Sequence, residues 1–212
     1  MMRYIATEAF EKTPVAADPF PHLVVRDFVS RENLASIAAD FPNLPGSGAF
    51  PPAALKLQGT FARLMEDLTA PWLRGAVEEK FGIDLSGRPL VWTMRGYVRE
   101  RDGAVHTDSE SKIVTLLLYL NEKWDNDGGR LRLLRSQDSL DNPVVEIPPD
   151  GGTLLCFLRG EKSWHGHLPY AGARRAVQLN FVTDDKVAAR EQRRHLLSAR
   201  MKQAEAFFQG GR

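Results

Sequence analysis

Short apolar runs separated by turn signals dominate the second half of the chain. They lie at residues 91–98, 113–120, 130–134, 144–147, 153–158 and 174–183. Glycine-rich turns such as Asp102-Gly103 and the segments 126–129 and 148–152 stand between them. Several short strands at close spacing, with no helical run between them, indicate an antiparallel sandwich or barrel.

Helical patterns flank this β-rich region. A strand-like run at 23–28 precedes a helix that Ser30 is expected to cap and that continues to Asp40. Two further helices are predicted at 60–68 and 70–81, the second ending at Gly82. After Asp185 the pattern is again helical, to about residue 209.

The last helix carries apolar residues on one face. The spacing of Leu197, Met201, Ala204 and Phe208 predicts that this face packs on the body of the protein. A homodimer formed through this helix is a second expectation. The whole chain is predicted to be one domain, with a supporting part at 1–89, a β core at 90–184 and the helix at 185–212.

Composition narrows the class of protein. Hydrophobic residues make up 43% and charged residues 26% of the 212 residues, and the net charge is +1. These values are ordinary for a globular protein and give no electrostatic argument for a nucleic-acid or membrane partner. No apolar run approaches the roughly 18 residues of a membrane span, so we expect a cytoplasmic protein. The single Cys156 lies in an apolar run and is expected to be a buried thiol.

His106 and Asp108 are the first candidates for chemistry. Residues at i and i+2 of an extended chain project to the same side, so this imidazole and carboxylate can converge on one ion. His165, 59 positions later, offers a third ligand, with His167 as its rival. Two histidines and a carboxylate on one face of a metal ion are typical of non-haem iron(II) oxygenases. The His-x-Asp triplet alone is weak evidence.

A strand with an arginine at its start gives the second candidate. In 174–181 the residues Arg174, Ala176, Gln178 and Asn180 share one face, and the more apolar face begins with Arg175. If the apolar face packs against helices, Arg174 points into the barrel, where its planar guanidinium can bind a carboxylate. Arg175 is the rival for this role, and Tyr119 could add a hydroxyl.

The order of these pieces resembles the 2-oxoglutarate/iron(II) dioxygenases, most closely the prolyl-4-hydroxylase-like branch. The resemblance extends from Val91 to about Val182. It rests on His106-Thr-Asp108, Leu-Leu-Tyr-Leu-Asn121, Asp127-Gly-Gly-Arg-Leu131, Pro149-Asp-Gly-Gly-Thr153 and Trp164-His165…Pro169…Arg174-Arg175. It implies a mainly β protein with flanking helices, whose core is a double-stranded β-helix, or jelly roll.

The resemblance also implies roles for single residues. It maps iron ligation onto His106, Asp108 and His165, and the family spacing of Pro169 favours His165 over His167. Arg174 and Tyr119 would bind the distal carboxylate of 2-oxoglutarate. Tyr97 matches a position that often lines the cofactor or substrate pocket.

The implied activity is hydroxylation of a C–H bond in a peptide side chain or small molecule, with release of succinate and CO2. Fe(II), 2-oxoglutarate and O2 are the expected cofactor and co-substrates, with L-ascorbate as a candidate reductant. Because Asp108 is present, hydroxylation is favoured over halogenation. Prolyl hydroxylation itself does not follow, since no segment reads as a substrate-covering loop. The alternatives are a cupin-like metal-dependent isomerase or sugar-binding jelly roll, and a non-catalytic interaction domain of the same fold.

Overall fold

The computed structural model describes the backbone of residues 4–210 and the side chains of residues 4–204. The helices are α1 (Thr7–Lys12), α2 (Arg31–Ala39), α3 (Gly59–Thr69), α4 (Pro71–Phe81) and α5 (Asp185–Gly210), with 3₁₀ turns η1 (Pro52–Ala54) and η2 (Glu100–Gly103). The strands are β1 (His22–Val25), β2 (Leu90–Val98), β3 (Lys112–Tyr119), β4 (Leu131–Leu134), β5 (Val145–Ile147), β6 (Leu154–Leu158), β7 (Trp164–His167) and β8 (Gly172–Val182). None of the helices within the described part of the chain has the length and apolar character needed to span a bilayer.

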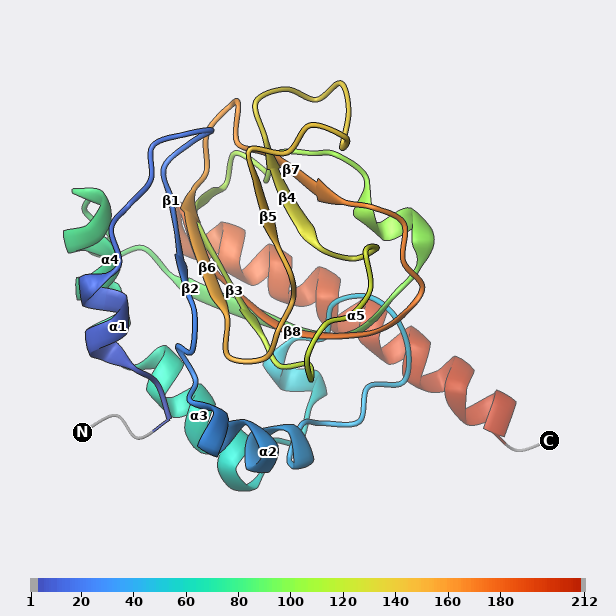
Figure 1. Ribbon diagram of the computed structural model, residues 1–212. Coiled ribbons are helices and arrows are strands. Elements are labelled where there is room, and N and C mark those ends of the chain that lie inside the picture. The colour runs from blue at the N-terminus through green and yellow to red at the C-terminus, as the bar shows by residue number, and fades with distance from the viewer. Residues whose placement is uncertain (1–3, 211–212) are drawn as a thin grey trace.

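Two antiparallel sheets face each other (Figure 1). The larger has the order β1-β6-β3-β8-β2 and the smaller the order β5-β4-β7. Helices α1 to α4 cover the outer face of the larger sheet, and α5 runs beside its β2–β8 edge (Figure 1). This arrangement confirms the predicted jelly roll with flanking helices.

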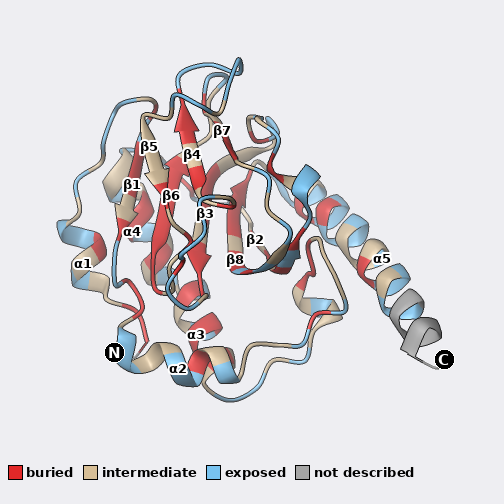
Figure 2. Cartoon of the chain, turned by 45° about the vertical axis from the view of Figure 1, so that its right-hand side comes forward, coloured by how far each residue is buried: buried red, intermediate tan, exposed pale blue. Residues whose placement is uncertain are grey.

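Alternation along the strands divides the core into two layers. On the helical face of the larger sheet, residues such as Leu116, Cys156 and Leu179 pack with Phe61 and Leu73 from the helices. On the opposite face, the residues between the two sheets are Phe20, Tyr119, Leu131, Leu133, Ile147, Leu155, Phe157 and Ala176. Figure 2 shows this buried interior and the exposed outer surface of α5. The strand pattern therefore turns one set of side chains toward the helices and the other into the barrel.

Most elements lie where the sequence predicts them, and the helix starting after Ser30 and the stop at Gly82, which has φ 62°, are confirmed. The strand predicted at 23–28 is wrong in extent, because β1 ends at Val25. Helix α1 was not predicted. The expected packing of α5 is also wrong, since Leu197 and Met201 are 65% and 59% exposed and Ala204 is exposed. Phe208 lies outside the residues whose side chains are described.

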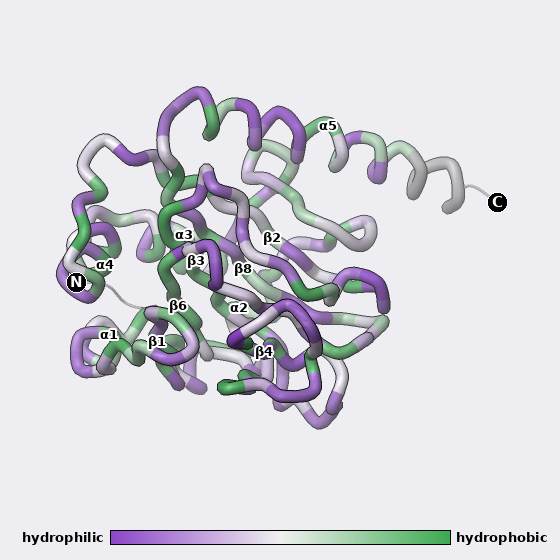
Figure 3. Tube along the Cα trace, turned by 90° about the horizontal axis from the view of Figure 1, so that it is seen from above, coloured by the Kyte–Doolittle hydropathy of each residue, from purple (hydrophilic) through white to green (hydrophobic). Residues whose placement is uncertain are grey.

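A different face of α5 lies against the protein. Ala188, Glu191 and Ala199 are buried, and the Lys202 ammonium lies 5.2 Å from the centre of the Phe50 ring. Seen from above in Figure 3, α5 crosses one side of the molecule with hydrophilic residues along much of its length. The contact therefore uses small and charged residues, which do not form an apolar stripe in the sequence.

Candidate active site

A backbone bridge joins the two segments that carry His106 and His165. The His106 N–H donates to the His165 carbonyl over 3.0 Å, and the His165 N–H donates to the His106 carbonyl over 2.9 Å. The two imidazole rings lie with their centroids 4.4 Å apart. His165 comes from β7, and His106 follows η2 in a short extended segment. This pairing holds two residues that are distant in sequence side by side.

Two glycines permit this close approach. A Cβ on Gly103 would lie 2.3 Å from the His167 carbonyl oxygen, and one on Gly166 would lie 2.8 Å from the Gly103 carbonyl oxygen. Both separations are shorter than carbon and oxygen atoms tolerate without a backbone shift. The segment before His106 can therefore rest on β7 only because these positions lack side chains.

The hydrogen bonds of both histidines leave one ring nitrogen free. Nδ1 of His106 lies 2.9 Å from the Ala104 carbonyl oxygen, and Nδ1 of His165 lies 2.9 Å from the Ser163 carbonyl oxygen. A carbonyl oxygen can only accept, so Nδ1 carries the proton and the Nε2 lone pair is available to a metal. Burial, with the charge of His106, lowers the pKa of His165 to about 4. His165 is therefore neutral at physiological pH, as a metal ligand must be.

Asp108 is a buried carboxylate held ionised by its neighbours. Lys112 Nζ lies 2.6 Å from Oδ1, and the Thr115 hydroxyl donates to Oδ2 over 2.5 Å. Burial acts to raise the pKa of Asp108, but the charge of Lys112 and these two hydrogen bonds lower it overall. Lys112 and Thr115, at the start of β3, thus fix the orientation and charge of the carboxylate. Neither was singled out from the sequence.

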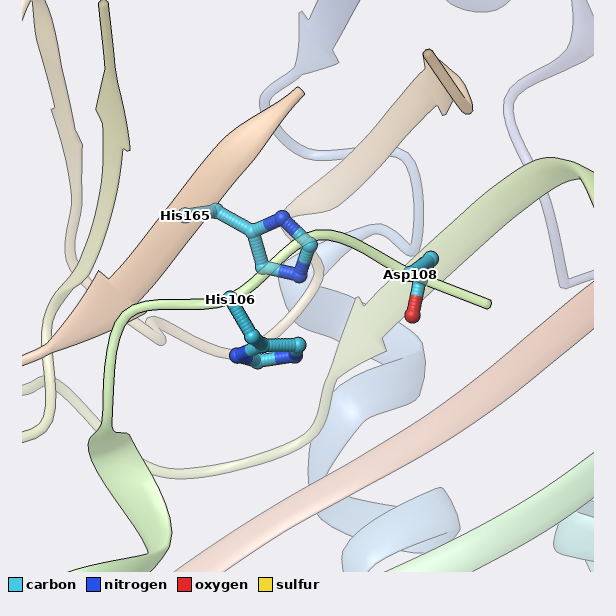
Figure 4. A group of neighbouring side chains, drawn as sticks. All are labelled: His106, Asp108 and His165. Atoms are coloured by element: carbon cyan, nitrogen blue, oxygen red, sulfur yellow. The ribbon is translucent and has the colours of Figure 1, made fainter. Parts of the chain in front are cut away.

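His106, Asp108 and His165 are turned toward one common space (Figure 4). One potential ligand atom from each lies within 4.8 Å of those from the other two. Two donors bound to one ion at about 2.1 Å can be at most about 4.2 Å apart, so small side-chain rotations suffice to close the group on a metal. Two neutral imidazoles and a carboxylate suit iron(II). His167, the rival ligand, is buried but does not belong to this group.

Arg174 and Tyr119 meet inside the barrel. Arg174 is 6% exposed and Tyr119 is fully buried. The Arg174 Nε donates to the Gly129 carbonyl over 2.8 Å, and its Nη2 lies 3.3 Å from the Tyr119 hydroxyl oxygen. Burial raises the pKa of Tyr119 although the charge of Arg174 opposes this, so the phenol stays protonated. The pair presents a buried cation and a hydroxyl, which suit a carboxylate.

Arg175 and Tyr97 lie elsewhere. The Arg175 guanidinium donates to the Ala38 carbonyl of α2 over 3.4 Å and lies 5.3 Å from the centre of the Phe41 ring. Arg175 therefore points to the helical face, as the alternation argument predicts. Tyr97 is 51% exposed, after a register shift between Arg95 and Tyr97 in the pairing of β2 with β8. The structure does not bring Tyr97 to Arg174 and Tyr119, and its role stays a prediction.

A cavity of about 340 Å³ opens beside the triad, within the size range of small-molecule sites. His106 and Asp108 line it, together with Arg95 on β2 and with Arg194 and His195 on α5. Sequence reasoning assigned neither Arg95 nor His195 to the site. His195 is half-buried and faces the cavity, and burial lowers its pKa to about 4. A larger cavity of about 810 Å³ beside α2 contains Arg175 but none of the triad.

Comparisons with known proteins agree with this site. Residues 93–182 match the family model of the 2OG-Fe(II) oxygenase superfamily. A search of curated proteins found no match. Among solved structures, a prolyl-4-hydroxylase from Pseudomonas putida is 21% identical with a TM-score of 0.53, over 76% of this chain and 85% of that one.

Two further structures have the same fold. A prolyl 4-hydroxylase from Phytophthora capsici is 18% identical with a TM-score of 0.53, over 87% of this chain and 64% of that one. A prolyl hydroxylase from Trichoplax adhaerens is 19% identical with a TM-score of 0.50, over 79% of this chain and 86% of that one. The family match spans the triad and Arg174, so this part of the chain is similar to the 2OG-Fe(II) oxygenase superfamily. Together with the triad, the match identifies the protein as a dioxygenase that uses Fe(II), 2-oxoglutarate and O2.

Proposed function

We propose that His106, Asp108 and His165 hold the iron(II), and that Arg174 and Tyr119 bind the distal carboxylate of 2-oxoglutarate. The observation that carries the proposal is the convergence of the three donors within 4.8 Å. When bound, iron and 2-oxoglutarate supply the oxidation of a C–H bond by O2, with succinate and CO2 as the products of 2-oxoglutarate. The protein is then a hydroxylase.

The residues of the chain position these groups and keep water away. The carbonyl oxygens of Ala104 and Ser163 orient the two histidines, and Lys112 and Thr115 orient the carboxylate. On the inner side, Phe157 lies edge-on to the ring of His165, with centroids 5.0 Å apart. Leu133 of β4 pairs with His165 of β7. This apolar wall supports a dry site, in which ionic contacts to a dicarboxylate are strong.

The substrate that we propose is a small molecule or a single peptide side chain, hydroxylated at a C–H bond. The size of the cavity beside the triad supports both. The Trichoplax adhaerens protein was solved in complex with a peptide fragment of the oxygen degradation domain of hypoxia inducible factor, which supports a peptide. A cytoplasmic location, L-ascorbate as reductant and a homodimer through α5 also remain part of the proposal. The cupin-like alternative is not favoured, because the family match and the His-Asp-His group both point away from it.

Metal-to-ligand charge transfer tests the ligand assignment. Purified protein with iron(II), kept free of oxygen, should develop a visible absorption band when 2-oxoglutarate is added. His106→Ala and Asp108→Ala should each abolish the band, while His167→Ala, which removes another buried histidine of the same strand as His165, should retain it. Loss of the band only in His167→Ala, or its persistence in both triad variants, would show that the assignment is wrong.

A further inference from the structure

Arg95 is a half-buried cation that is paired with none of the residues whose side chains are described. It lies on β2 opposite Ala176 of β8, on the strand face that looks into the barrel. Its Nε is buried without a hydrogen-bond partner. Among the residues whose side chains are described, no hydrogen bond and no ion pair within 4 Å involves the Arg95 guanidinium. Buried arginines normally have an acceptor, because an uncompensated charge in the interior is strongly unfavourable.

The nearest charges do not change this picture. Burial and the positive charge of Arg174 both lower the pKa of Arg95, while Asp102 and Asp108 act in the opposite direction from a greater distance than an ion pair. Asp102 is already engaged by Arg99, and Asp108 by Lys112. Within the described part of the chain, the donors of this guanidinium are therefore available to a ligand.

The cavity shows where that group would lie. Arg95 lines it together with His106 and Asp108, whereas Arg174, Tyr119 and His165 do not. The cavity therefore reaches the triad through His106 and Asp108 and does not include the proposed 2-oxoglutarate anchor. A molecule in it would face the metal position with one end and Arg95 with another.

Helix α5 closes the other side of this cavity with more positive charge. Arg190 and Arg194 line it, and Glu191 is the acidic residue that α5 contributes. Lys112 also lines the cavity, but its charge is matched by Asp108 at 2.6 Å. Apart from this pair, three arginines (Arg95, Arg190 and Arg194) and one glutamate (Glu191) line the cavity. Their net charge is positive and favours an anion.

We propose that the primary substrate is a small molecule with a carboxylate or phosphate group, which Arg95 binds inside this cavity and Arg194 of α5 helps to bind at its mouth. The inference rests on the proposed function for the reaction at the triad. To the proposed function it adds that the substrate is an anion and that Arg95 selects it. Guanidinium groups bind both anions through paired N–H donors, so the chemistry is shared and the experiment must separate the two sources.

The first test measures succinate formation by the iron-loaded enzyme with 2-oxoglutarate and matched pairs of compounds. Carboxylates are paired with their amides (hexanoate with hexanamide, benzoate with benzamide), and phosphates with their alcohols (glycerol phosphate with glycerol, glucose 6-phosphate with glucose). We expect an anionic member to raise turnover at least tenfold more than its neutral partner. The pair that responds identifies the anion. Equal stimulation by a neutral partner would overturn the proposal.

The second test replaces the arginine. Arg95→Gln should raise the KM of the active anion at least tenfold, while the Kd of 2-oxoglutarate, read from the charge-transfer band, stays within twofold. An increase in the Kd of 2-oxoglutarate with unchanged KM would mean that Arg95 serves the co-substrate, and would overturn the proposal. Absence of the band in the unmodified enzyme would instead refute the proposed function.

A third measurement needs no substrate and decides the case if no compound of the panel is active. Arg95→Met should raise the melting temperature of the iron- and 2-oxoglutarate-loaded protein, because it removes a charged group whose Nε is buried without a partner. Arg132→Met is the control and should lower it, since Arg132 lies 2.6 Å from Glu146. If Arg95→Met lowers the melting temperature as Arg132→Met does, Arg95 is structural and the proposal is wrong.

Discussion

Replacement of Arg174 separates the two candidate anchors for 2-oxoglutarate. A guanidinium has five N–H donors. In Arg174 one of them contacts Gly129 and one contacts Tyr119, which leaves three for a carboxylate. In Arg174→Met, two charge-assisted hydrogen bonds to the co-substrate would be lost, each worth about 1.5–3 kcal/mol. Even about 3 kcal/mol in total corresponds to a roughly 100-fold weaker affinity.

The matched control is the next residue in the chain. Arg175→Met removes the same charge, but from the helical face, where the side chain lies over Phe41. We expect the Kd of 2-oxoglutarate to change less than twofold in this variant. Arg174→Lys should lie between the two, because an ammonium is a point charge and cannot make the paired contact.

An anaerobic titration of the iron(II) protein with 2-oxoglutarate, followed by the charge-transfer band, gives the Kd of each variant. Circular dichroism establishes that the variants are folded, since Arg174→Met also removes the contact to Gly129. A large loss of affinity in Arg175→Met with none in Arg174→Met would refute the assignment of strand faces on which the argument rests.

Three further predictions concern stability and the support of the triad. The pKa of Glu146 is lowered in the folded protein, because Arg132 and Arg130 outweigh the effect of burial. The ionised carboxylate therefore stabilises the protein above the ordinary pKa of 4.5, and this stabilisation is lost as the pH falls. Glu146→Gln should lower the free energy of unfolding by about 0.5–1 kcal/mol at pH 7, and urea titrations should show the difference vanishing in acid; a constant difference would contradict it. Gly103→Ala should weaken iron binding roughly tenfold, because it displaces the segment before His106. Gly160→Ala is the control and should leave the affinity unchanged, since a Cβ at Gly160 meets nothing within 4 Å. Equal iron affinities of the two variants would argue against the contact at Gly103. Leu133→Ala should lower the free energy of unfolding by about 2–5 kcal/mol, and a loss below about 1 kcal/mol would mean that the inter-sheet core is not tightly packed.

The sequence predicts the strands and the pair His106 and Asp108 because both depend on local spacing, whereas His165 joins them through a bridge between distant segments. The alternation in β8 correctly separates Arg174 from Arg175, and the i, i+2 spacing correctly brings His106 and Asp108 to one side. Strand β7 is harder to see, since its four residues include a glycine and two polar histidines. Its place in the smaller sheet is set by pairing with β4, which is a contact between distant segments.

The prediction for Tyr97 shows where alternation stops being informative. A register shift between Arg95 and Tyr97 interrupts the pairing of β2 with β8, so Tyr97 is half exposed while Arg95 has a buried Nε. Such an irregularity changes which side chains face the barrel and leaves no clear trace in the sequence. An arginine in the otherwise apolar run at 91–98 was the available signal, because a charged residue in a buried strand requires a partner.

The two sides of the cavity have different origins in the chain. The triad, Arg174 and Arg95 all lie within residues 93–182, the part that matches the superfamily. Arg194 and His195 belong to α5, which begins at Asp185 and lies outside that match. Because α5 lies outside the matched part and lines the cavity, we expect it to influence which molecule reaches the metal. Substitutions on the cavity face of α5 should therefore alter substrate choice while the turnover of 2-oxoglutarate to succinate continues.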